Sequence, residues 1–282
     1  MAVPVDRGRE ELDLEEIEVE LLLEGIHRLY GFDFRQYAPA SLRRRLRRRM
    51  DGENVETVSA LQDVILHDPQ VMERLLLDLS INVTSMFRDP TFFLAFRKQI
   101  VPVLRTYPFS RIWVAGCSTG EEVYSLAILL AEEGLSERAR IYATDINESV
   151  LEQARLGIFP LEKMKEYTQN YIRAAGTHAF SEYYVARYEG AQFSRGLVEN
   201  VVWAQHNLAS DAVFNEFNVI ACRNVMIYFD KSLQAHVHEL FYDSLAMFGI
   251  LALGQKETIK FSPREPAYEE LNPEERLYRK VR

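Results

Sequence analysis

The segment from Arg111 to Asp145 constrains the fold of this chain more than any other. It reads as a strand, a glycine-bearing turn, a helix and a second strand that ends in a carboxylate. This order builds a nucleotide-type pocket, because the turn lets the backbone approach a ligand and the carboxylate, roughly 30 residues on, can bind two ribose hydroxyls. The segment therefore predicts a doubly wound sheet with a ligand site after its first strand.

The turn itself narrows the class of ligand. It holds only Gly116 and Gly120 in place of the full glycine fingerprint, so a dinucleotide is not favoured. Glu121 and Glu122 follow at the helix N-terminus, where they suit the helix dipole but would repel a pyrophosphate. A ligand with a ribose, a positive centre and no phosphate fits better, and S-adenosylmethionine has that description. The alternative is an ordinary doubly wound sheet with a structural turn.

Size and composition set the broad class. The chain has 282 residues, 48% of them hydrophobic and 27% charged, as in a globular protein long enough for two domains. Cys117 and Cys222 form neither a disulfide framework nor a metal motif, so we expect a reducing cytoplasm and no metal. No apolar run is long enough for a bilayer, and the N-terminus has no apolar signal core. The net charge of −9 argues against a general nucleic-acid binder.

Residues 10–80 are expected to be entirely helical. Their apolar positions keep helical spacing and carry no strand alternation. The caps and breakers predict helices that begin near Leu14 (capped by Asp13), Ser41, Thr57 and Pro69, the first three ending near Gly31, Gly52 and His67. Asp89-Pro90 then caps a further helix, which we expect to link this part to the rest of the chain.

From residue 111 the pattern alternates between strand and helix. Continuous apolar runs indicate strands buried on both faces, hence a mostly parallel sheet. A long helix is expected over 231–248, and an alternating stretch with a central turn inside 158–198 indicates a small antiparallel appendage. The predicted strands span 111–117, 140–146, 199–206, 217–223, 249–254 and 276–281.

Two further segments place polar residues where ligands bind. Arg223 and Asn224 follow a buried strand, at the carboxyl end where open parallel sheets bind ligands, and Tyr228 lies in the loop beyond. The segment from Asn82 to Arg88 lies at the seam between the expected domains, where clefts form.

Four motifs occur in an order and at spacings like those of the CheR family, the chemotaxis-receptor glutamate O-methyltransferases. They are N-V-T-S-M-F-R-D from Asn82, G-C-S-T-G-E-E-V-Y-S from Gly116, A-T-D-I from Ala143 and C-R-N-V-M-I-Y-F-D from Cys222. The resemblance covers nearly the whole chain. It implies an α/β fold: a Rossmann-like S-adenosylmethionine-dependent methyltransferase domain with a small antiparallel β-subdomain, preceded by an all-helical N-terminal domain. The corresponding bounds are 10–80 for the helical domain, 81–110 for a linker and connecting helix, 111–282 for the methyltransferase domain and about 158–198 for the β-subdomain.

The resemblance also implies a reaction, in which S-adenosylmethionine methylates the side-chain carboxylate of receptor glutamates and leaves S-adenosylhomocysteine. Arg88 and Tyr228 are then the expected grip on the substrate carboxylate. Asp145 takes the ribose hydroxyls, and Asn207-Leu208 lies near the adenine. The implied cofactor-binding set is Asn82, Thr84, Arg88, Glu121, Glu122, Asp145, Asn207, Leu208, Arg223 and Asn224. A glutamate carboxylate, with a pKa of about 4.3, is already a nucleophile at neutral pH, so no general base is required.

A basic helix stands out against the acidic remainder. Leu42, Leu46 and Met50 recur at four-residue spacing and predict its buried stripe, with arginines on the remaining faces. In the resembled family the equivalent helix faces acidic stretches of receptor coiled coil, which makes the cytoplasmic helical region of methyl-accepting receptors the expected partner and ties the protein to membrane arrays only through them. The expected receptor-binding residues are Arg43, Arg44, Arg45, Arg47, Arg48 and Arg49. The alternatives are a solvated helix offset by the acidic first helix and, less favoured, a nucleic-acid surface.

The chain departs from the family pattern in two places. Gln255 stands where family members often carry histidine in G-H-S-E, and the β-subdomain region lacks a glycine-rich turn, so we favour a member that needs no receptor tether. Two other functions stay open: a methyltransferase of the same fold acting on RNA or a small molecule, and a cofactor-binding adaptor without catalysis.

Overall fold

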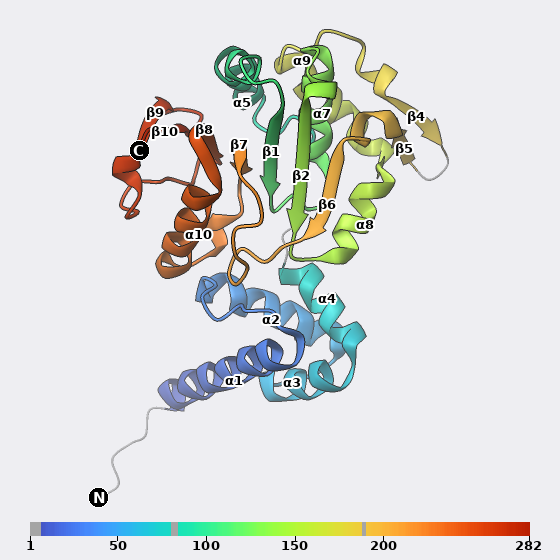
Figure 1. Ribbon diagram of the computed structural model, residues 1–282. Helices are drawn as coiled ribbons and strands as arrows, with labels where there is room; N and C mark the ends of the chain where they lie inside the picture. Colours follow the sequence, from blue (N-terminus) through green and yellow to red (C-terminus); the bar gives the residue numbers. More distant parts are fainter. Residues whose placement is uncertain (1–6, 80–83, 188–189) are drawn as a thin grey trace, which may run out of the picture. The chain divides into compact units, whose positions relative to one another are not determined.

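The computed structural model describes residues 7–79, 84–187 and 190–282, with side chains from residue 14 onward. The expected cofactor residue Asn82 lies outside these ranges. Contacts divide the chain into two compact units, Met1–Ile81 with Tyr228–Leu233, and Asn82–Ile227 with Gln234–Arg282 (Figure 1). Each unit has its own core and is described by itself.

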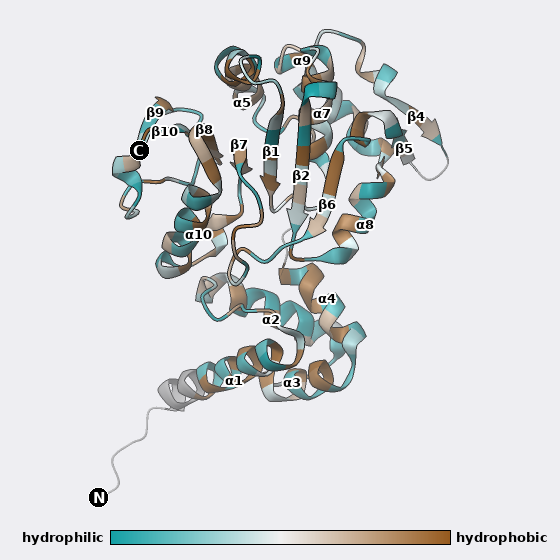
Figure 2. Cartoon of the chain, in the orientation of Figure 1, coloured by the Kyte–Doolittle hydropathy of each residue, from teal (hydrophilic) through white to brown (hydrophobic). Residues whose placement is uncertain are grey.

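The first unit is all-helical, as predicted. Its helices are α1 Arg7–Tyr30, α2 Pro39–Glu53, α3 Val58–His67 and α4 Pro69–Leu79. Gly31 ends α1 with a φ of +78°, and the Thr57 hydroxyl caps α3 by accepting from the Ala60 amide at 3.1 Å. The start predicted for α1 near Leu14 was wrong, because the residues before it are also helical. Figure 2 shows apolar and polar residues alternating along these amphipathic helices.

A short segment from late in the sequence completes this unit. The Ala38 amide donates to the Tyr228 carbonyl at 2.9 Å, and the Asp230 amide donates to the Gln36 carbonyl at 2.9 Å. The rings of Tyr37 and Phe229 lie 5.1 Å apart. Tyr228–Leu233 therefore packs with the N-terminal helices, although 148 residues of sequence separate Leu79 from Tyr228.

The second unit is built on a sheet of strand order β6-β2-β1-β7-β8-β10-β9 (Figure 1). The strands from β6 to β8 pair in parallel, and β10 and β9 add antiparallel at one edge. Their bounds are β1 Ser110–Ala115, β2 Ala139–Asp145, β6 Val201–Gln205, β7 Phe217–Cys222, β8 Leu245–Leu253, β9 Tyr268–Asn272 and β10 Leu277–Lys280. This confirms the mostly parallel sheet; β9 had not been predicted.

Helices connect and cover these strands. They are α5 Pro90–Ala95, a π-helix Phe96–Ile100 and α6 Val101–Leu104 in succession, then α7 Glu121–Glu132, α8 Glu148–Leu156, α9 Met164–Arg173 and α10 Lys231–Ser244. The helix expected to reach residue 248 ends at Ser244, and β8 begins at the next residue. The run from Leu245 to Leu253 is continuously apolar apart from Gly249, a pattern that does not distinguish a buried helix from a buried strand.

A separate sheet of order β3-β5-β4 forms the antiparallel appendage that the sequence predicted. Its strands are β3 Ile158–Phe159, β4 Tyr184–Arg187 and β5 Gly190–Phe193. Aromatic rings join this sheet to α7, since the ring centre of Tyr124 lies 5.2 Å from that of Phe159 and 5.6 Å from that of Phe193. In the described part of the chain, no helix is both long and apolar enough to cross a membrane.

Candidate active site

The strand order reverses between β1 and β7, which makes this point the expected place for a ligand. Because the strands are parallel, the segments that follow β1, β2, β6 and β7 emerge at the same edge of the sheet. These segments hold most of the residues singled out in the sequence: Glu121 and Glu122 after β1, Asp145 at the end of β2, Asn207 and Leu208 after β6, and Arg223 and Asn224 after β7. The topology thus gathers residues that are far apart in the sequence.

Asp145 is buried at the end of β2 and is held by the backbone. Its two carboxylate oxygens accept from the Ser118 amide at 2.9 Å and the Asn147 amide at 3.1 Å. Burial raises the pKa of Asp145, and these amide donors oppose the rise. The bond from Ser118 joins the turn after β1 to the end of β2, so the carboxylate has a fixed place beside the glycine turn.

The backbone around this edge is strained at residues other than glycine. Ser118 and Asn224 have φ values of +50° and +61°, in the turns after β1 and β7. Phe87 and Asp89, on either side of Arg88, have φ values of +49° and +56°. Left-handed conformations at such residues persist only where the surroundings hold them, and they cluster at functional sites.

The two glycines of the first turn are needed for close packing. A Cβ on Gly116 would lie 2.5 Å from a methyl carbon of Val225, so the turn after β1 and the loop after β7 are in direct contact. Gly120 has a φ of +95°, and a Cβ there would lie 2.9 Å from that of Ala154. From the sequence, these glycines were expected to let a ligand approach the backbone. In the structure they also allow neighbouring segments to pack closely.

Arg223 joins three segments of the site. Its side chain is only 1% exposed and bridges two carboxylates, Glu122 at 2.7 Å and Asp89 at 2.7 Å. It also donates to the Arg88 carbonyl at 3.3 Å, and its guanidinium lies 3.9 Å from the centre of the Phe92 ring. Arg223 therefore ties the loop after β7 to the first turn of α7 and to the segment before α5.

The two acids that open α7 have different surroundings. Glu122 pairs with Arg223, whereas Glu121 is buried and accepts from the hydroxyls of Thr119 at 2.7 Å and Tyr167 at 3.2 Å. Burial raises the pKa of Glu121, against these hydrogen bonds. Of the two, Glu122 thus belongs to the ionic network of the edge.

The remaining predicted residues are placed as follows. Thr84 and Arg88 are half-buried in the segment before α5. Asn207 and Leu208 are buried after β6, next to β2, since the His206 amide donates to the Asp145 carbonyl at 3.0 Å. Tyr228 is half-buried within the helical unit, where the Arg45 guanidinium lies 4.8 Å from the centre of its ring.

The basic helix α2 differs from the expected pattern at Arg45. The side chain is buried, donates to the Leu79 carbonyl and stacks on Tyr228, so its expected place on the exposed surface was wrong. Spacing of the leucines gave no sign of this, because a long arginine stem packs much like an apolar side chain. Met50, expected in the buried stripe, is only partly buried.

Acids of the same unit offset most of the other arginines of α2. The pairs are Arg43 with Glu16, Arg47 with Glu15, Arg48 with Asp78, and Arg49 with both Asp78 and Glu53. Arg44, Arg47 and Arg48 are exposed, and the side chain of Arg48 is 80% exposed. The exposed basic surface therefore includes fewer than six arginines, with these three the most exposed.

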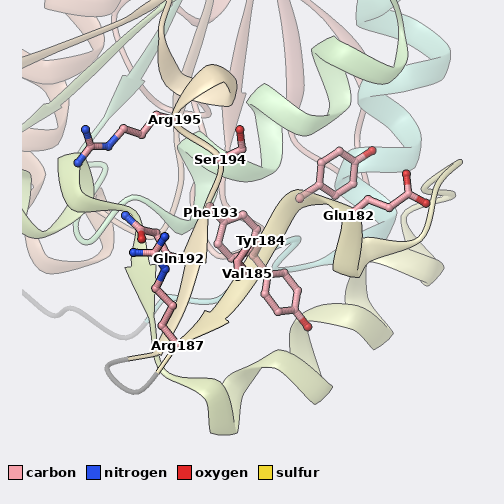
Figure 3. A pocket seen from close by; sticks show the side chains of 9 residues that line it. Glu182, Tyr184, Val185, Arg187, Gln192, Phe193, Ser194 and Arg195 are labelled. Atoms are coloured by element: carbon pink, nitrogen blue, oxygen red, sulfur yellow. The ribbon is translucent and has the colours of Figure 1, made fainter.

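A pocket of about 400 Å³ lies on the small sheet, along its edge strand β4 (Figure 3). Arg187, Gln192 and Arg195 gather at one end, with the rings of Tyr184 and Phe193 beside them. None of its lining residues belongs to the predicted cofactor set. Because the tether was considered for this small sheet, the expectation that the protein needs no receptor tether stays a prediction.

Sequence reasoning missed three participants. Asp89 had been read only as a helix cap, yet its carboxylate pairs with Arg223 and makes no capping bond. The Ser118 amide anchors Asp145. Glu257 accepts hydrogen bonds from four backbone amides in the loops after β7 and β8. In its segment Gly254–Glu257, which reads G-Q-K-E, only Gln255 had been singled out from the sequence. The partners in these contacts lie at least 27 residues apart in the sequence or include a backbone amide. A local sequence pattern therefore cannot predict them.

The donor set suits an adenosyl ligand better than a phosphate. The edge presents carboxylates at Asp145 and Glu122, whereas the nearby guanidinium of Arg223 is already shared between two acids. In the described part of the chain, no group of His, Cys, Asp and Glu could hold a metal ion.

Comparison with known proteins agrees with this geometry. Residues 82–272 match the family model described as CheR methyltransferase, SAM binding domain, and residues 17–80 match CheR methyltransferase, all-alpha domain. A Pseudomonas putida protein called Cher3 is 49% identical over 94% of this chain and 97% of its own length.

More distant relatives carry the name chemotaxis protein methyltransferase. The one from Escherichia coli is 34% identical over 66% of this chain and 64% of its own length. The one from Listeria innocua is 27% identical over 83% of this chain and 87% of its own length. Together with the two family matches, these relatives show that the chain belongs to the CheR family of S-adenosylmethionine-dependent chemotaxis methyltransferases.

Proposed function

We propose that this protein transfers a methyl group from S-adenosylmethionine to the side-chain carboxylate of specific glutamates in methyl-accepting chemotaxis-type receptors. The products are glutamate methyl esters and S-adenosylhomocysteine. The observation that carries the proposal is the Asp145 carboxylate, which two backbone amides hold beside the glycine turn and which suits a pair of ribose hydroxyls. The names of the relatives support a chemotaxis receptor as the substrate.

The main requirement of this reaction is that the protein position the two reacting groups. A glutamate carboxylate is ionised at neutral pH and attacks directly, so no side chain has to remove a proton. Bound S-adenosylmethionine supplies the methyl group on a positively charged sulfur. Because an anion and a cation lose charge as they react, exclusion of water favours the reaction. Alignment of the reacting groups can contribute roughly 7–11 kcal/mol in favourable cases.

In this proposal the residues divide the work. Asp145 binds the ribose, Asn207 and Leu208 bind the adenine, and Glu122 lies toward the methionine end. Arg223 acts as a positioning residue, since each of its two terminal nitrogens pairs with a carboxylate of the protein. A carboxylate that leaves water needs a partner, and Arg88 and Tyr228 are proposed to supply a guanidinium and a hydroxyl.

The exposed arginines of α2 are proposed to select the receptor. Arg44, Arg47 and Arg48 form a positive surface that fits an acidic helical partner. Arg45 is excluded from this role because it is buried. An RNA substrate has less support, because the chain as a whole carries a net charge of −9.

The experiment incubates the protein with methyl-labelled S-adenosylmethionine and cytoplasmic fragments of chemotaxis receptors. We expect label on the fragment that mild alkali releases as methanol, which identifies a carboxyl ester. Fragments with the methylated glutamates changed to alanine serve as the matched control and should take up no label.

Two other outcomes would contradict the proposal. Alkali-stable label, or label on RNA, would point to a methyltransferase with another substrate. Tight binding of S-adenosylhomocysteine with no transfer to any acidic receptor fragment would point to an adaptor without catalysis.

A further inference from the structure

Four backbone amides converge on the carboxylate of Glu257. The donors are the amides of Asn224 at 2.9 Å, Val225 at 2.8 Å, Met226 at 2.8 Å and Gly254 at 2.6 Å. Glu257 is buried at the turn that follows β8, and the Asn224 to Met226 amides belong to the loop that follows β7. One side chain thus joins the loops of two adjacent strands at the ligand edge of the sheet.

The arrangement calls for an anion. Three successive amides that point to one place form a nest, a feature that binds negatively charged groups. A carboxylate can accept all four bonds through its two oxygens. A glutamine of the same shape would present an amide nitrogen to at least one backbone N–H, so both groups would be left unsatisfied in a buried place.

The nest also accounts for the strained backbone at the first of its residues. Asn224 has a φ of +61°, which a residue other than glycine seldom adopts. Gly254 lets the other loop come close, because a Cβ there would lie 2.8 Å from the Asn224 nitrogen and 2.7 Å from a Glu257 oxygen. On the other side, Val225 packs against Gly116 of the turn after β1. The loop is therefore fixed from both sides.

We propose that Glu257 is a positioning residue for cofactor binding, whose carboxylate holds the backbone from which Arg223 and Asn224 extend. This inference rests on the proposed function, which assigns both residues to the cofactor site. It also gives the divergent G-Q-K-E segment a simple reading. Gly254 and Glu257 make the contacts, whereas Gln255 is exposed and can vary without disturbing the nest.

The test compares three variants with the wild-type protein: Glu257→Gln, Glu132→Gln and Gln255→Ala. Glu132 is the matched control, because it too is a buried carboxylate with several hydrogen-bond donors, but its partners lie at the far end of α7. Calorimetry measures the Kd for S-adenosylhomocysteine, thermal unfolding measures the Tm, and methyl-transfer assays separate KM for S-adenosylmethionine from kcat.

We expect Glu257→Gln to raise the Kd and the KM about 10- to 100-fold, as for loss of a group that orients a binding residue. Glu132→Gln should lower the Tm and leave the Kd within about twofold, and Gln255→Ala should leave both unchanged. If the two glutamine variants shifted the Kd alike, or if Glu257→Gln bound with wild-type affinity, the proposal would be overturned.

A fourth variant covers the case in which Glu257→Gln does not fold. Gly254→Ala places a methyl group against the same contact, so a weaker but clear loss of affinity is expected, and wild-type affinity would contradict the proposal. Because affinity for S-adenosylhomocysteine needs no receptor, a failure to methylate receptor glutamates would count against the proposed substrate and leave the result for Glu257 in place.

Discussion

The carboxylate of Glu132, at the end of α7, should be a large source of pH-dependent stability. Its side chain is 1% exposed and accepts from the Tyr183 hydroxyl at 2.9 Å and the Thr177 amide at 2.9 Å, as well as from Arg97 and Tyr171. Three of these donors come from the insertion that contains α9 and the small sheet. Glu132 therefore ties that insertion to the main sheet unit.

The size of the effect follows from the ionisation of this group. Burial acts to raise the pKa of Glu132, but the hydrogen bonds from its donors outweigh burial and lower the pKa from 4.5 to about 2. A tenfold change in an acid constant corresponds to about 1.4 kcal/mol, so Glu132→Gln should cost roughly 3 kcal/mol in the free energy of unfolding at pH 7.

Urea unfolding of the wild type and of Glu132→Gln between pH 7 and pH 3 measures this. Because the folded-state pKa lies below the unfolded value, the stabilisation is complete above about pH 5, falls as the pH drops below about 4.5, and is lost near pH 2. Glu133→Gln, which removes a more exposed carboxylate beside it, should cost less than about 1 kcal/mol. A difference between wild type and Glu132→Gln that stayed constant down to pH 3 would refute the reasoning.

Three further predictions concern the site and its partner. Asp145→Ala should weaken S-adenosylhomocysteine binding at least about tenfold in calorimetry, because it removes the ribose acceptor and two backbone contacts; unchanged affinity would remove Asp145 from the cofactor site. Arg88→Ala should mainly lower kcat in transfer assays, and intact turnover would end its assignment as the carboxylate grip. Receptor-fragment binding should fall steeply as NaCl rises above about 0.15 M, where screening is shorter than about 8 Å, and Arg48→Ala should reduce that salt dependence; binding indifferent to salt would exclude this surface.

Local sequence patterns predicted those parts of the site that are built from residues close together in the sequence. The turn between β1 and α7 and the carboxylate at the end of β2 follow from one continuous segment, and the structure confirms both elements. The contacts of Arg223 could not be found this way, because Glu122 and Asp89 lie 101 and 134 residues away in the sequence. Only the tertiary fold brings them together.

The wrong predictions for Arg45 and for the end of α10 have a common cause. The spacing of apolar residues in the sequence does not reveal which other parts of the protein pack against them. At Arg45 the helix gives a charged side chain a buried place that its flexible stem can fill. At the boundary between α10 and β8, the apolar run suits either element, and only pairing with β7 decides for the strand.

The segment Tyr228–Leu233 has a consequence for how the protein is made. Because the N-terminal helices pack against residues that leave the ribosome some 150 residues later, their unit cannot be completed while it is being synthesised. A fragment that stops after α4 would lack the backbone bonds at Gln36 and Ala38 and the ring partners of Tyr37 and Arg45. Such a fragment would expose these groups to water and to other nascent chains.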